Sequence, residues 1–103
     1  MRSIKSYSEL QRIISENESL LVYLTAPDCS VCHADMPRVE RLVEEMDFPS
    51  VQIDLAEVPE AAGQLTVFTA PVTLLFYRGR EYHMEARMID FNMLKKRMLE
   101  LKG

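Results

Sequence analysis

Two cysteines three residues apart constrain this chain more than any other feature, because they stand between an apolar run and a helical pattern. The apolar run, residues 20–24, predicts a short buried strand that Pro27 ends. The residues that follow predict a helix, and the spacing places the sulfur atoms of Cys29 and Cys32 on one face of its first turn. Unpaired N–H groups and the helix dipole stabilise a thiolate there, so we expect the pKa of the Cys29 thiol to be lowered.

The positions of the two cysteines in this predicted helix suggest different roles. We expect Cys29 to be the nucleophile. Cys32 lies one turn further into the helix and is more shielded, so it can close a disulfide with Cys29 and expel whatever Cys29 has captured. Two cysteines this close cannot staple a fold of this size, and the cytosol keeps thiols reduced. Catalysis or metal binding is therefore favoured over a structural disulfide.

Length, charge and hydropathy limit the class of protein. A chain of 103 residues is one domain, spanning residues 1–103, with a single core. No apolar run approaches the about eighteen residues of a membrane span. The net charge of −4 argues against nucleic-acid binding, and the basic run at residues 95–97 predicts a solvated helix face. The first residues lack the apolar stretch of a secretory signal, so we expect a cytoplasmic protein.

The first half of the chain predicts alternating helices and strands. Ser6 and Glu9 have the spacing of a capping box and predict a helix that ends near residues 16–19. The run at residues 20–24 is apolar without alternation, which is typical of a central strand covered on both faces. A longer helix is expected over residues 30–46, with Pro37 inside it as the cause of a kink.

The second half predicts a strand at residues 51–55, a short helix over Pro59–Leu65 and an antiparallel hairpin with strands at 72–77 and 82–88. Asp90 can cap a last helix. The order βαβ, then a helix, then ββα indicates the α/β class, with about four strands in a mixed sheet and about four helices on its two faces.

Four features of the sequence occur together in a known family. They are the C-x-x-C pair at a helix start, Pro37 eight residues after the first cysteine, the segment at residues 67–76 and the turn glycine Gly79. Over essentially the whole chain this pattern resembles the thioredoxins. The resemblance implies the thioredoxin fold and a cis bond before Pro71, which would lie against the active-site disulfide. Such a bond removes a ladder donor and leaves a backbone edge that a bound peptide can pair with.

The resemblance also implies a function, which is thiol–disulfide exchange through a dithiol–disulfide cycle of Cys29 and Cys32 that reduces disulfides in cytosolic proteins. We expect no metal and no organic cofactor. Electrons would come from a separate reductase or a low-molecular-weight thiol, the substrates would be disulfide-containing proteins, and the chain would act as a monomer. The residues that we assign to substrate binding are Ala70, Pro71, Asp28, Ser30, Val31 and Arg87.

The surroundings of the expected nucleophile depart from the thioredoxin pattern. Asp28 stands where thioredoxins usually have Trp, and its negative charge beside Cys29 opposes thiolate formation. Ser-Val replaces the usual Gly-Pro at residues 30–31. Arg87 stands at the position of a small glycine on the substrate face, where its charge can partly offset that of Asp28.

The surroundings of the resolving cysteine also depart from that pattern. Tyr23 occupies the position of the buried carboxylate that would accept the proton of Cys32, and Ser50 lies near the position of its lysine partner. These changes keep a second function open, a redox-sensing or protein-binding module with little turnover. An insulin-type disulfide reduction assay separates the two functions.

Two other kinds of site share parts of the motif. The segment Cys29–His33 matches the C-x-x-C-H pattern of covalent haem attachment, but that reaction takes place outside the cytosol and no export signal is expected here. A zinc site needs four ligands, and only His33 or His83 could join the two cysteines. We expect His33 to lie at the surface near the site, His83 to be solvated, and the seven methionines to fill the core.

Overall fold

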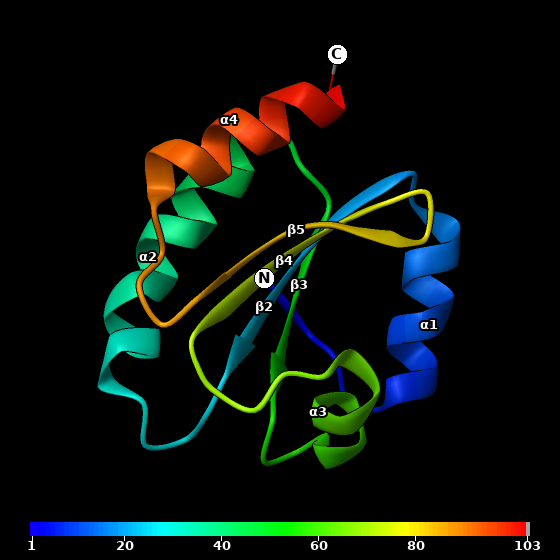
Figure 1. Cartoon of the computed structure of the whole chain (residues 1–103), viewed down its shortest axis with the longest axis vertical. Helices are drawn as coiled ribbons and strands as arrows, with labels where there is room; N and C mark the ends of the chain where they lie inside the picture. The colour runs from blue at the N-terminus through cyan, green and yellow to red at the C-terminus, as the bar shows by residue number, and fades with distance from the viewer. Residues whose placement is uncertain (103) are drawn as a thin grey trace.

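A computed structural model describes residues 1–102 and contains a five-stranded mixed sheet with helices on both faces (Figure 1). The elements in chain order are β1 (Arg2–Ser3), α1 (Tyr7–Glu16), β2 (Ser19–Thr25), α2 (Ser30–Glu45), β3 (Ser50–Asp54), α3 (Pro59–Leu65), β4 (Val72–Tyr77), β5 (Arg80–Ala86) and α4 (Phe91–Lys102). The strand order is β1-β3-β2-β4-β5. Strands β1, β3 and β2 run parallel, and β4 is antiparallel to both β2 and β5. The predicted α/β class, a mixed sheet with helices on both faces, is confirmed.

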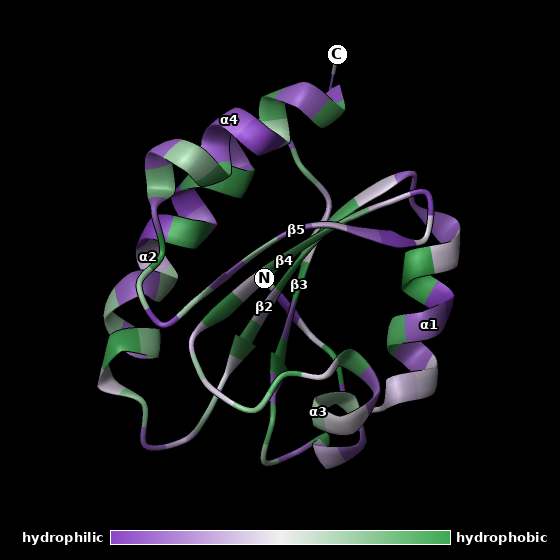
Figure 2. Ribbon diagram, in the orientation of Figure 1, coloured by the Kyte–Doolittle hydropathy of each residue, from purple (hydrophilic) through white to green (hydrophobic). Residues whose placement is uncertain are grey.

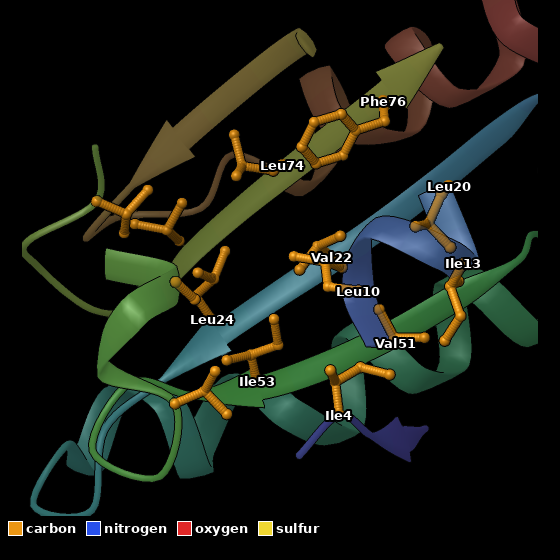
Figure 3. Close-up of a cluster of buried hydrophobic side chains, with 14 residues drawn as sticks. Ile4, Leu10, Ile13, Leu20, Val22, Leu24, Val51, Ile53, Leu74 and Phe76 are labelled. Carbon is orange, nitrogen blue, oxygen red and sulfur yellow. The ribbon is translucent and has the colours of Figure 1, made fainter. Parts of the chain in front are cut away.

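The sheet separates two apolar cores. One lies under α1 and α3 and is built on the inner strands; Figure 3 shows its side chains. The other lies under α2 and α4. In Figure 1 the two helix pairs lie on opposite sides of the sheet. Figure 2 shows that the inner strands are the most hydrophobic part of the sheet.

Strand β2 is central and covered on both faces, as its unbroken apolar run predicts. Leu20, Val22 and Leu24 pack into the core under α1 and α3, whereas Leu21 and Tyr23 pack into the core under α2 and α4. All five side chains are at most 1% exposed. Because alternate residues of a strand point to opposite faces, only a strand with two covered faces buries such a run.

Two predicted helix caps are present. Ser6 accepts a hydrogen bond from the backbone N–H of Glu9 at 3.1 Å, and Asp90 accepts one from Met93 at 3.0 Å. The Glu9 carboxylate accepts a hydrogen bond from the N–H of Lys5, one residue before the position expected in a capping box. Both helices therefore begin where the sequence predicts, with side chains satisfying their free N–H groups.

Strand β1 was not predicted. It has two exposed polar residues, too few for any periodicity, and pairs with β3 through Arg2 opposite Val51. The following residue, Ile4, is 1% exposed, and its N–H donates to the Gln52 carbonyl at 2.9 Å. The burial of Ile4 fixes this short fifth strand at the edge of the sheet.

The hairpin of β4 and β5 is present, but the expectation that His83 is solvated is wrong. The strand ends at Ala86, before the predicted end at residue 88, because Arg87 takes a positive φ of 69°. His83 pairs with Leu75 of the core under α2 and α4, so the polar side of β5 lies on that face of the sheet. There the side chains of His83 and Glu85 are 22% and 10% exposed and lie 2.7 Å apart. Met84, on the opposite face of β5, is 41% exposed.

Candidate active site

The cysteine pair lies where the chain passes from β2 into α2. Residues 26–28 form the connection, and the N–H of Cys29 donates to the Ala26 carbonyl at 3.3 Å. Cys29 is the N-cap of α2, with extended backbone angles, and its Sγ accepts the N–H of Cys32 at 3.1 Å. The helix therefore begins at the first cysteine and directs a free N–H group at its sulfur atom.

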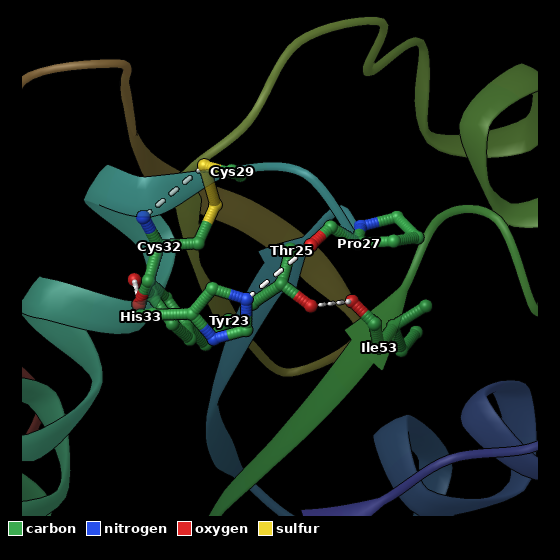
Figure 4. Close-up of a disulfide and its surroundings, with 7 residues drawn as sticks. All are labelled: Tyr23, Thr25, Pro27, Cys29, Cys32, His33 and Ile53. Carbon is green, nitrogen blue, oxygen red and sulfur yellow. Dashed lines mark hydrogen bonds between the residues drawn. A yellow bond between two sulfur atoms is a disulfide. The ribbon is translucent and has the colours of Figure 1, made fainter.

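The two cysteines are joined in a disulfide with Cα atoms 5.2 Å apart (Figure 4). Cys29 is half-buried, whereas Cys32 is 0% exposed. Cys32 is therefore closed to attack from outside, and Cys29 is the only partly exposed residue of the pair. Ser30 and Val31, between the cysteines, are both exposed.

Beneath the disulfide, Tyr23 makes a side-chain hydrogen bond that links the central strand to this turn. Its hydroxyl donates to the Cys32 carbonyl at 2.9 Å, and the side chain is 0% exposed. Burial, with a smaller contribution from the negative charge of Asp35, raises the pKa of Tyr23 to about 12. At neutral pH Tyr23 is an uncharged donor that positions Cys32 and does not take its proton.

A second segment of the candidate site lies at the same end of the sheet. The pairing of Leu24 with Val72 places the preceding residue, Pro71, beside the end of β2, where the cysteine loop begins. The bond between Ala70 and Pro71 is cis. Ala70 is half-buried, and the Pro71 carbonyl accepts the N–H of Arg87 at 2.7 Å. This bond ties the bend after β5 to the Pro71 loop.

The charged residues assigned to the site lie on its surface. Asp28 is exposed on the loop before Cys29, and Arg87 is exposed at the bend. No ion pair within 4.0 Å joins the two side chains in the part of the chain that the structure describes. The offset of one charge by the other therefore stays a prediction.

Exposed apolar side chains lie on each of the three segments of the site, which are the start of α2, the chain before Pro71 and the bend after β5. Val31 on α2 is 49% exposed, Phe68 before the Pro71 loop is 77% exposed, and Met88 after the bend is 88% exposed. The exposure of Phe68 and Met88 was not predicted from the sequence, because apolar residues in such segments are usually buried. Their position in the sequence could have indicated them, since each lies within three residues of a residue assigned to the site.

His33 follows Cys32 in the first turn of α2 and is exposed, with Nε2 3.4 Å from the Pro27 carbonyl (Figure 4). Among residues 1–102, no three His, Cys, Asp or Glu side chains lie together as ligands for a metal ion. None of the helices formed by these residues has the length and apolarity needed to cross a membrane.

Comparisons with known proteins agree with this geometry. The family model for thioredoxin matches residues 3–98. The chain is 33% identical over 101 residues to the thioredoxin-like protein YdfQ of Bacillus subtilis (strain 168), covering 95% of this chain and 88% of that protein. In structure it is similar to a mutant thioredoxin from Halobacterium salinarum NRC-1, with a TM-score of 0.90 and 25% identity over 99% of this chain and 90% of the other. A Plasmodium falciparum thioredoxin has the same fold, with a TM-score of 0.87 and 20% identity over 96% of this chain and 98% of the other.

Proposed function

The chain belongs to the thioredoxin family, and from this membership we propose that it reduces disulfide bonds of proteins through a cycle of Cys29 and Cys32. One observation carries the proposal, the unequal exposure of the two sulfur-bearing residues. Cys29 is half-buried at a helix N-cap, whereas Cys32 is fully buried one turn behind it. An accessible attacking thiol backed by a shielded resolving thiol is what disulfide reduction requires.

In the proposed cycle the reduced protein attacks first. The Cys29 thiolate attacks a substrate disulfide, forms a mixed disulfide and releases one substrate thiolate. The Cys32 thiolate then attacks Cys29 Sγ, which forms the Cys29–Cys32 disulfide and releases the second substrate thiolate. Both substrate thiolates take up protons, so two electrons and two protons pass to the substrate. A separate reductant then returns the disulfide to two thiols.

Two neighbouring groups have opposite effects on the formation of the Cys29 thiolate, which the first step requires. The N–H of Cys32 lies 3.1 Å from Cys29 Sγ and favours the thiolate, whereas the neighbouring Asp28 carboxylate disfavours it. Tyr23 is neutral at physiological pH and already donates its proton to the Cys32 carbonyl. The Cys32 proton must therefore leave to water or to the departing substrate thiolate.

Substrate would lie over the cysteines as an extended segment. The Ala70–Pro71 loop offers it backbone groups, and Ser30 and Val31 border the reacting sulfur atom. Exposed apolar side chains of the three surrounding segments suit an unfolded or flexible protein segment. Asp28 and Arg87 would select charges on either side of the substrate disulfide.

We propose that the protein acts as a monomer in the cytoplasm, without a metal or an organic cofactor. Electrons come from a separate reductase or a low-molecular-weight thiol, because the disulfide supplies none of its own.

One observation favours a second function, a redox-sensing or protein-binding module with little turnover. The buried group below Cys32 is a phenol with a pKa of about 12, which removes an internal proton acceptor and slows resolution. Reduction of insulin disulfides with dithiothreitol as electron source separates the two functions. The reductase gives many turnovers per molecule, whereas the sensor gives about one.

Replacement of each cysteine tests the assigned roles. Cys29→Ser should abolish insulin reduction, whereas Cys32→Ser should accumulate mixed disulfides with the substrate because nothing resolves them. Mass spectrometry after alkylation measures the adducts, and the Cys29→Ser/Cys32→Ser double variant is the control. Adducts on the Cys29→Ser variant and none on the Cys32→Ser variant would reverse the roles.

A further inference from the structure

A hollow of about 180 Å³ lies between α2 and α4, away from the cysteines. Three cations line it, Arg38 and Arg41 from α2 and Lys95 from α4, against one acid, Glu45. The chain as a whole has a net charge of −4. A concave cationic site on an acidic protein is a local reversal of charge, and a hollow concentrates the field of the charges that line it.

The cations of this hollow are available to a ligand. Arg41 and Lys95 form no ion pair within 4.0 Å in the part of the chain covering residues 1–102, and Arg38 has only Asp35, at 4.0 Å. The Arg38 guanidinium lies 3.9 Å from the centroid of the Phe91 ring. Stacking on this ring holds the guanidinium at the wall of the hollow and leaves its N–H groups free.

The hollow lies within reach of a protein that is bound at Cys29. Arg38 and Arg41 follow Cys32 by six and nine residues on the same helix, which is about 9 and 14 Å along its axis. Lys95 stands near the start of α4, the helix that follows the Arg87 bend. Figure 1 shows α2 and the first turns of α4 side by side on one side of the sheet. An extended segment of about five residues spans the distance.

We propose that this hollow binds an acidic segment, rich in Asp and Glu, of the protein whose disulfide reacts with Cys29. The inference rests on the proposed function. Two guanidinium groups and an ammonium group match carboxylates, which arginine binds through paired hydrogen bonds. The small volume suits one or two side chains, and the acidic remainder of the surface repels a long polyanion such as nucleic acid. The hollow therefore adds selectivity for partners with a carboxylate-bearing segment near their disulfide.

The test uses two synthetic peptides with the same internal disulfide, a five-residue spacer and a tail of four Glu or four Gln. At low ionic strength the protein should reduce the Glu peptide with a kcat/KM about five- to tenfold higher, and the ratio should fall towards one at high salt. Arg41→Gln/Lys95→Gln should remove the preference without changing the rate on the Gln peptide. Lys95→Glu, a single charge reversal that leaves two arginines against two acids, should also remove it.

The matched control is Arg78→Gln/Arg80→Gln, which removes two exposed positive charges from the tip of the hairpin, one on the turn after β4 and one on the first residue of β5. This variant should keep the preference for the Glu peptide. Equal rates on both peptides in the wild type, a preference that survives in the hollow variant, or an equal loss in the control would overturn the docking site. Failure to reduce either peptide would instead overturn the proposed function.

Discussion

At the scale of single residues, Tyr23 is the side chain that most distinguishes this site. A carboxylate at this position, as in the thioredoxins that the sequence resembles, would exchange a proton with Cys32. The phenol instead holds the Cys32 carbonyl at 2.9 Å and stays neutral, because burial raises the pKa of Tyr23 to about 12. Its role is to position the first turn of α2.

The raised pKa of Tyr23 predicts a loss of stability at alkaline pH. The folded protein keeps the phenol protonated up to about pH 12, whereas the unfolded chain ionises it near 10.0. The stabilisation is complete below pH 10 and is lost as the pH rises towards 12, by about 2–3 kcal/mol. Urea unfolding at several pH values measures it. Tyr23→Phe should not show this alkaline loss of stability, whereas the control variant Tyr7→Phe should still show it. An unchanged alkaline loss in the Tyr23→Phe variant would show that Tyr23 is not its source.

Asp28 is expected to restrain the nucleophile. Its carboxylate neighbours Cys29 and disfavours a second negative charge, so Asp28→Asn should lower the Cys29 thiol pKa. The loop is exposed, and neighbouring charges in water interact by about 1 kcal/mol, which limits the change to less than about one pKa unit. Thiolate absorbance against pH in the reduced protein measures it. Asp47→Asn, on a distant exposed loop, is the control, and an unchanged or raised pKa in the Asp28 variant contradicts the argument.

The sequence was sufficient to predict the chemistry-bearing residues of the site but not their surroundings. Cys29 and Cys32 were predicted from spacing and a helix start alone. The exposure of Phe68 and Met88 was not, because hydropathy does not say which apolar residue the fold leaves uncovered. His83 was misjudged for a similar reason, since alternation shows which residues share a face and not which face α4 covers.

At the scale of elements, the regular helices and strands were predictable and the shortest strand was not. Strand β2 has an unbroken apolar run and two covered faces, which is a strong signal. Strand β1 has two polar residues and exists because β3 offers it an edge and Ile4 is buried beside it. Long-range pairing of this kind leaves no local pattern in a sequence.

The anchoring of β1 can be measured through Ile4. The side chain is 1% exposed within the core under α1 and α3, so Ile4→Ala should destabilise the protein by about 2–5 kcal/mol. Arg2→Ala, in the same strand but exposed, loses only a surface ion pair with Glu9 and should change the free energy of unfolding by less than about 1 kcal/mol. Urea titration of both variants tests this. Equal small losses would show that β1 does not contribute to the folded core.

At the scale of the whole molecule, the cysteine pair and the cationic hollow lie apart on the same side of the sheet. The cysteines and the Pro71 loop lie at one end of the sheet, and the cationic hollow lies farther along the layer of α2 and α4. Both depend on α2, whose N-cap and first turn carry the cysteine pair and whose middle carries Arg38 and Arg41. One helix therefore links the reacting sulfur atoms to the surface proposed to select the partner.

The proposed direction of electron flow predicts which redox form of the whole molecule is more stable. In a thermodynamic cycle, a fold that favours the disulfide lowers the potential of the Cys29–Cys32 couple below that of the unfolded chain, and the oxidised protein then unfolds at higher urea. A reductant should show this order, with a potential near about −270 mV, whereas a fold that favours the two thiols gives an oxidant near about −120 mV.

Equilibration with dithiothreitol and glutathione buffers gives the potential, and urea unfolding of both forms gives the stability difference independently. Each 30 mV should match about 1.4 kcal/mol between the two measurements. A reduced form that is more stable than the oxidised form would show that the protein works as an oxidant, against the proposed function.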